Sequence, residues 1–155
     1  MEQLQVRKAE PADAATIGRL LARLDLALPD GEVAARLRWF SRSGADHILV
    51  AVSGREAVGL LTLSVVPRMT HDGSFARISF LGVPAGPEHA WVARALLGEA
   101  EGLARRHQCT SMEIMAESTP TDDPEDVLHA LGFHTDTGHP VRCVRALPPP
   151  TTVRI

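Results

Sequence analysis

The sequence predicts one α/β domain built on a central mixed sheet of about six or seven strands, flanked by about four helices. Two apolar runs rich in β-branched residues, 47–52 and 57–66, have the composition of buried strands. A third run, 75–83, leads through a loop of glycine and prolines into a long amphipathic helix and a further strand, 109–116. A strand, a helix and a strand in this order form a right-handed unit with parallel strands, so the sheet should be mixed.

The composition fits a single domain over residues 1–155. A chain of 155 residues that is 45% hydrophobic can bury a sizeable core without disulfides or metal ions. The formal net charge of −3 gives no excess of basic residues, so we expect no nucleic-acid partner.

The targeting and cysteine patterns predict a cytoplasmic protein. No apolar run approaches the roughly 20 residues of a membrane span, and the N-terminus has no signal-peptide core, so we expect no membrane contact. Cys109 and Cys143 lack the spacing of a zinc site, which predicts no metal and two buried thiols in a reducing compartment.

The N-terminal part predicts a short strand over 4–9 and two helices. Asp13 is a suitable N-cap, and apolar residues then recur at i, i+3, i+4 and i+7 as on a buried helix face. These residues are Ile17, Leu20, Leu21 and Leu24. A second helix contains Val33, Leu37 and Phe40 and should end near Ser43.

The next segments predict a hairpin and a third strand. Residues 53–56 have the composition of a tight turn between the runs 47–52 and 57–66. Both runs are almost continuously apolar, which favours central strands covered on both faces. The polar segment 67–74 should form the loop before strand 75–83.

The C-terminal part predicts the long helix, a short helix and a last strand. The long helix should bury Val92, Leu96, Leu97, Ala100 and Leu103. The short helix begins at Asp123 and ends at Gly132 in the left-handed conformation, after which Phe133 should pack back on it. Residues 140–147 alternate as a last strand before a run of prolines.

The junction between strand 75–83 and the long helix predicts an anion site. The first N–H groups of a helix have no intrahelical partner, and the helix dipole adds partial positive charge there. A phosphate can therefore bind at this point without a basic side chain.

The order of the elements over residues 4–147 resembles the GNAT N-acetyltransferase superfamily. The phrase ALLGEAEGLARRHQCTSMEI is similar to the family's long helix and following strand, and VLHALGF is similar to its Leu-Gly-Phe helix end. The loop spacing resembles the family's pyrophosphate loop, with Val83 ending the strand and Ala93 at the second small position. The loop is degenerate, because Glu88 stands where the family has Arg or Gln and Trp91 where it has the first Gly.

The resemblance implies that acetyl-CoA lies as co-substrate between strands 75–83 and 109–116, with its pyrophosphate on the loop. The coenzyme contacts that it implies are Leu81, Val83, His89, Ala90, Trp91, Val92, Ala93 and Arg94. The indole of Trp91 would either point outward or occupy the place of the anion.

The catalytic positions of the family have changed in this chain. Leu128 stands at the position of the family's tyrosine acid, and Arg77 where some relatives have a glutamate base. Glu117 and His71 are our candidates for proton transfer, although a histidine in such a loop is more often a solvated surface group. Arg77 either forms a surface pair with an acid or binds a substrate carboxylate, and Asp72 is a second candidate substrate contact.

The resemblance implies an acyltransferase that moves an acetyl group from acetyl-CoA to the primary amine of a small molecule. The alternative is a protein of this fold that has lost acyl-CoA chemistry and serves as a binding or assembly module, or supports another reaction in the cleft. The edge of the predicted last strand would allow two copies to pair as a homodimer.

Overall fold

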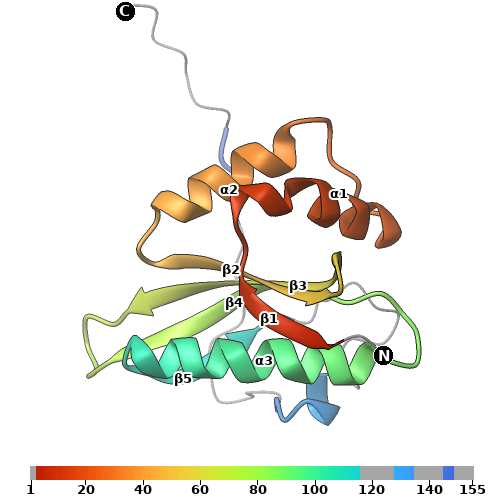
Figure 1. The fold of residues 1–155 in the computed structure, drawn as a ribbon. Coiled ribbons are helices and arrows are strands. Elements are labelled where there is room, and N and C mark those ends of the chain that lie inside the picture. The colour runs from red at the N-terminus through yellow and green to blue at the C-terminus, as the bar shows by residue number, and fades with distance from the viewer. Residues whose placement is uncertain (1–2, 116–127, 135–144, 149–155) are drawn as a thin grey trace, which may run out of the picture.

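The computed structural model describes residues 3–115, 128–134 and 145–148. Within them, one sheet of five strands lies between a layer of two helices and a layer of one (Figure 1). The strands are β1 (Leu4–Lys8), β2 (Asp46–Ser53), β3 (Glu56–Pro67), β4 (Ser74–Gly82) and β5 (Cys109–Ile114). The helices are the 3-10 turn η1 (Pro11–Asp13), α1 (Ala14–Arg23), α2 (Glu32–Arg42) and α3 (His89–Arg106).

The sheet has the strand order β1-β2-β3-β4-β5. The first three pairs are antiparallel and the β4–β5 pair is parallel, which confirms the predicted mixed sheet and its strand–helix–strand unit. The described residues hold five strands rather than the six or seven predicted. Of the predicted last strand, residues 140–144 lie outside the described part of the chain, and residues 145–148 are exposed and do not form a strand.

The predicted short helix is described only at its end. Residues 128–130 are helical, and Gly132 has a φ of +91°, which confirms the predicted left-handed stop. The N–H of Phe133 donates to the carbonyl of Leu128 at 3.0 Å, so the chain turns back as expected. Asp123 and the start of this helix lie outside the described residues.

The two helical layers cover opposite faces of the sheet (Figure 1). The predicted buried face of α3, including Leu96 and Ala100, packs in the larger core cluster with Leu61 and Ile78 of the sheet. Close approach of α3 to β3 requires Gly59, because a β-carbon there would lie 2.8 Å from the Leu96 side chain. The smaller cluster joins α1 and α2 to the other face. The central strands are therefore covered on both sides, as predicted.

Asp13 precedes α1 as predicted, but its side chain does not cap that helix. The carboxylate instead accepts two hydrogen bonds from the Arg7 guanidinium, at 2.7 and 2.8 Å, and one from the N–H of Glu10 at 2.7 Å. These bonds hold the pKa of Asp13 below, and that of Arg7 above, its ordinary value. The pair connects β1 to the start of α1.

No helix among the described segments is long and apolar enough to cross a membrane.

Candidate functional site

Strands β4 and β5 part before β4 ends. Their pairing runs from Ser74 opposite Cys109 to Ile78 opposite Ile114, whereas β4 continues to Gly82. Within the described residues, the segment 79–82 therefore has no strand beside it on the β5 side. A free strand edge presents N–H and C=O groups to which an extended ligand can add as a further strand.

A β-bulge in β4 lies at the point where the strands part. Thr62 of β3 is opposite Phe80, but the next residue, Leu63, is opposite Ile78, so Ser79 is the extra residue. The Ser79 hydroxyl lies 2.7 Å from that of Thr62. Ser79 and Phe80 therefore both face the α1–α2 layer, although neighbouring residues of a regular strand face opposite sides.

Gly82 allows the Phe80 ring to lie across the end of β4. A β-carbon at Gly82 would lie 2.6 Å from two ring carbons of Phe80 and 2.8 Å from the Leu24 side chain. Any larger residue would therefore displace this ring.

The N-terminus of α3 presents two backbone N–H groups that have no hydrogen-bond partner among the described residues. The N–H of His89 donates to Gly86 at 3.2 Å and that of Val92 to Glu88 at 2.9 Å. The N–H groups of Ala90 and Trp91 between them have no hydrogen-bond partner among the described residues, and no side chain caps the helix. These donors and the helix dipole can bind an anion.

The predicted coenzyme contacts divide into core and surface residues. The side chains of Leu81, Val83, Val92 and Ala93 are buried, so only their backbone is available to a ligand. At the surface, Ala90 and Arg94 are exposed, His89 is half-buried, and Trp91 is 47% exposed. The Glu88 side chain is exposed and does not cap the helix.

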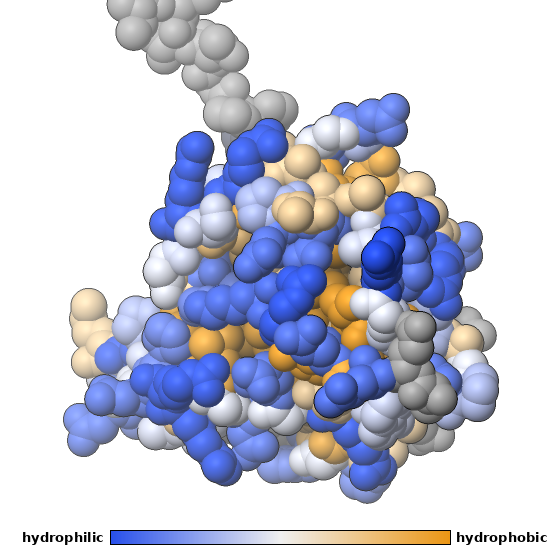
Figure 2. Space-filling model, in the orientation of Figure 1, coloured by the Kyte–Doolittle hydropathy of each residue, from blue (hydrophilic) through white to orange (hydrophobic). Residues whose placement is uncertain are grey.

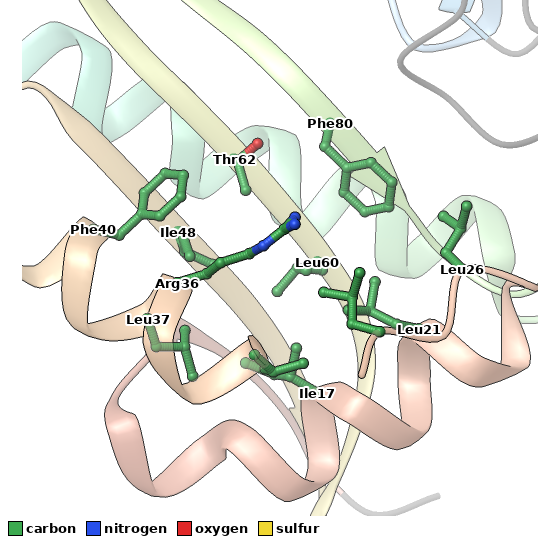
Figure 3. A pocket seen from close by; sticks show the side chains of 12 residues that line it. Ile17, Leu21, Leu26, Arg36, Leu37, Phe40, Ile48, Leu60, Thr62 and Phe80 are labelled. Atoms are coloured by element: carbon green, nitrogen blue, oxygen red, sulfur yellow. The ribbon is translucent and has the colours of Figure 1, made fainter. Parts of the chain in front are cut away.

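A cavity of about 370 Å³ lies between the α1–α2 layer and the sheet (Figure 3). Its lining is almost entirely aliphatic and aromatic. The lining residues are Ile17, Leu21, Leu26, Leu28, Val33, Arg36, Leu37, Phe40, Ile48, Leu60, Thr62 and Phe80. In the space-filling view, hydrophobic surface shows between the α1–α2 layer and α3, and hydrophilic residues surround it (Figure 2). Phe80 belongs both to this lining and to the part of β4 beyond its pairing with β5, so the cavity adjoins the strand edge of residues 79–82.

Arg36 is the charged residue of this lining. Its Nε donates to the Glu32 carboxylate at 3.0 Å, one helical turn earlier. Nη1 and Nη2 have no hydrogen-bond partner within the described part of the chain, and the side chain is 59% exposed. In Figure 3 the side chain extends from α2 across the cavity in the direction of Thr62 and Phe80.

His71 and Asp72 lie at the other end of the sheet from the α3 head. They are exposed in the loop before β4, and this loop touches the turn before β5, since the N–H of Ser74 donates to Gln108 at 3.3 Å. From Ser74 to the bulge at Ser79, β4 extends about 16 Å at about 3.3 Å per residue. The structure therefore does not bring these two residues to the place where β4 and β5 part, and their chemical roles stay predictions.

Arg77 forms the surface pair that was one of its two predicted roles. Its Nε donates to the Glu113 carboxylate of β5 at 2.7 Å, and its guanidinium carbon lies 5.3 Å from the centre of the Phe75 ring. Both charged side chains are about half-exposed. Glu117 lies outside the described residues, while Leu128 is buried.

Arg36, Thr62, Ser79 and Phe80 were not predicted from the sequence as residues of the site. A signal for Arg36 was present, because it follows Val33 by three residues and precedes Phe40 by four, so a charge stands within the apolar stripe of that helix. Nothing in the strand pattern marks the bulge at Ser79, because an extra residue is visible only when the partner strand is aligned.

Comparison with known proteins identifies the fold. No family model matches the sequence, and no curated protein matches it. Solved structures match over nearly the whole chain: an acetyltransferase from Trypanosoma brucei has a TM-score of 0.73 at 20% identity, covering 94% of this chain and 100% of that one. Glucosamine-6-phosphate N-acetyltransferase from Arabidopsis thaliana has a TM-score of 0.73 at 12% identity, covering 93% and 100%.

A third match is an aminoglycoside acetyltransferase from an uncultured soil metagenomic sample, with a TM-score of 0.69 at 23% identity, covering 92% of this chain and 99% of that one. These similarities, together with the mixed sheet and its parted parallel strands, confirm the resemblance predicted from the sequence. The chain has the fold of the GNAT N-acetyltransferase superfamily.

Proposed function

We propose that this protein transfers an acetyl group from acetyl-CoA to the primary amine of a small molecule. The observation that carries the proposal is the position of Phe80, which lies both on the part of β4 beyond its pairing with β5 and in the lining of the cavity. A thioester held along that strand edge would lie beside an acceptor in the cavity.

Backbone groups would supply most of the coenzyme binding. The pantetheine amides would pair with the edge 79–82, and the diphosphate would accept hydrogen bonds from the N–H groups of Ala90 and Trp91. Arg94, exposed one turn further along α3, adds a positive charge to this end of the helix, whereas Glu88 adds a negative one.

In the reaction, the amine nitrogen attacks the thioester carbonyl carbon. A C–N bond forms, the C–S bond breaks, and the coenzyme leaves as a thiolate that takes up a proton while the amine loses one. Holding the two reactants in line supplies much of the acceleration in such a reaction. Of the candidates for proton transfer, Glu117 follows β5, the strand that parts from β4, and His71 is at the opposite end.

Binding of acetyl-CoA tests the helix head directly. At about a hundredfold excess over its dissociation constant, the coenzyme should stabilise the protein by about 2.7 kcal/mol, measured by thermal unfolding. Ala90→Pro removes one free N–H and should weaken binding about tenfold, since a hydrogen bond to a charged group contributes about 1.5–3 kcal/mol. Proline is tolerated in the first turn of a helix.

His89→Pro is the matched control, because it places proline in the same turn but removes an N–H that already has a partner. Equal loss of affinity in both variants would show that the free donor is not used. No thermal shift at millimolar acetyl-CoA would reject the coenzyme site and favour the alternative of a binding module. Stabilisation by acetyl-CoA without release of its thiol in the presence of any amine tested would likewise favour that alternative.

A further inference from the structure

We infer that the acceptor is an amino acid with an apolar side chain, whose carboxylate is bound end-on by Arg36. This inference rests on the proposed function, because it assigns the substrate class of the same cavity. It follows from the chemistry of the lining, from the free atoms of one guanidinium, and from the place of the strand edge.

The lining of the cavity favours a ligand with an aliphatic or aromatic side chain. Among the described residues around the cavity, eleven of twelve are uncharged, and two of them, Phe40 and Phe80, present aromatic rings. The volume of about 370 Å³ is at the lower end of the range of about 300–1,000 Å³ for small-molecule sites. Removing an aliphatic or aromatic side chain from water is favourable in such a cavity.

Arg36 selects an anionic group. Glu32 occupies its Nε, and the N–H groups on Nη1 and Nη2 remain for a ligand. These groups lie in the plane of the guanidinium and match the two oxygens of one carboxylate. The bond to Glu32 therefore leaves the two terminal nitrogens of Arg36 open to a ligand.

The same lining disfavours a polycationic acceptor. None of the described lining residues carries a carboxylate, and the charge present is positive. The Glu32 carboxylate lies beside Arg36 but is paired with it at 3.0 Å, so an amine with several ammonium groups would find no unpaired acidic partner among the described lining residues. The described lining is thus unsuited to aminoglycosides, although some structural neighbours act on them by name.

The placement of the free strand edge orients the amino acid. With the carboxylate on Arg36 and the side chain among the apolar residues, the amine would lie near Phe80, the lining residue on the part of β4 beyond its pairing with β5. The α-amine must be neutral to attack, and it would lose its proton to the thiolate or to a base on the way.

Binding of two probes that share one apolar body tests the inference. L-Phenylalanine and 2-phenylethylamine differ by the carboxylate alone, and their affinities for the full chain are measured by calorimetry without coenzyme. Phenylalanine should bind about tenfold more tightly than phenylethylamine. Kanamycin, as the polycationic probe, should bind more weakly than either.

The variant Arg36→Gln should abolish the preference for phenylalanine while leaving the affinity for phenylethylamine within about twofold. Arg38→Gln is the matched control, because Arg38 is exposed on the same helix and does not line the cavity. Arg36→Lys keeps the charge but cannot bind a carboxylate bidentately, so it should retain only part of the preference for phenylalanine.

Several results would overturn the inference: equal binding of the two probes, binding of neither, tighter binding of kanamycin, or a preference that survives Arg36→Gln. Acetyl transfer is then measured separately as thiol release from acetyl-CoA. If phenylalanine binds through Arg36 but releases no thiol, the proposed function fails and the assignment of the cavity stands. If phenylethylamine or kanamycin is acetylated in preference to phenylalanine, the proposed function stands and the substrate class is wrong.

Discussion

The two faces of the sheet use the same strands in different ways. On β3, Leu61 and Leu63 point to α3 and are fully buried, whereas Leu60 and Thr62 point to the α1–α2 layer and line a cavity. The α3 face is close-packed, with Gly59 allowing the helix to approach the strand. The α1–α2 face leaves about 370 Å³ unfilled beside the end of β4. The α3 face is therefore the more tightly packed of the two, and the α1–α2 face has room for a ligand.

The largest expected effect comes from a cavity created on the close-packed face. Leu96 of α3 is 0% exposed, so Leu96→Ala should lower the free energy of unfolding by about 3 kcal/mol, measured by urea denaturation. Leu21→Ala is the matched change on the other face, where the side chain is half-buried beside existing space. It should cost about 1 kcal/mol. Equal losses would show that the two faces are packed alike.

The next effect concerns the tie between β1 and the α1–α2 layer. Asp13 is 8% exposed and accepts three charge-assisted or backbone hydrogen bonds, so Asp13→Asn should cost about 2 kcal/mol. Because the folded pKa of Asp13 is lowered, its contribution is present above the unfolded pKa of about 3.9. The contribution is lost as the pH falls through the lower folded pKa.

Unfolding followed from pH 6 to pH 2 measures this contribution, and the Asp13→Asn variant should lack it. Glu56→Gln is the control, since Glu56 pairs with Arg19 at 3.0 Å but both side chains are 57% exposed. Its effect on the free energy of unfolding should be smaller than that of Asp13→Asn, because solvent screens an exposed pair. A pH profile identical in wild type and Asp13→Asn would contradict the assigned role of the Arg7–Asp13 pair.

The sequence allowed the order of the elements to be predicted because each element has its own local signal. The apolar stripe of α3, the turn at 53–56 and the left-handed Gly132 are all visible in short windows, and the structure confirms them. Asp13 is the N-cap residue of α1, as predicted, but its side chain makes no capping hydrogen bond to that helix. A short window contains the helix start, but it does not show that Arg7 of a neighbouring strand reaches the same carboxylate.

The site was less predictable because it depends on how separate elements are placed together. The free N–H groups of Ala90 and Trp91 follow from helix geometry alone and were expected from the helix start. The cavity requires two helices to stand away from the sheet, and the bulge at Ser79 requires the register of β3 and β4. Neither distance nor register can be determined from one segment of sequence.

A smaller effect should come from the buried histidine of β2. His47 of β2 is 8% exposed, its Nε2 has no partner among the described residues, and its ring centre lies 5.1 Å from that of His107. Burial lowers its pKa, Lys8 and His107 lower it further, and Asp46 opposes them. The unfolded state thus takes up a proton more readily than the folded state.

Stability should therefore fall as the pH drops below the unfolded pKa of about 6.5, and level off below the folded pKa. His47→Leu should flatten this part of the profile, measured as the change in Tm between pH 7.5 and pH 5. The control His71→Leu changes an exposed histidine and should keep the wild-type slope. A wild-type slope in the His47→Leu variant would show that a group other than His47 causes the pH dependence of Tm.

The smallest effect is expected on the exposed part of the α1–α2 side of the sheet, beyond the cavity. Arg77 and Glu113 form a pair at 2.7 Å with both side chains about half-exposed, so Arg77→Gln should change the free energy of unfolding by about 0.5 kcal/mol or less. Arg77 does not line the cavity, and we therefore expect this variant to bind phenylalanine with wild-type affinity, whereas Arg36→Gln does not. Calorimetry on the two variants compares the two arginines directly. A tenfold loss in Arg77→Gln at unchanged stability would favour its second predicted role, binding of a substrate carboxylate, and would move the anion contact from α2 to β4.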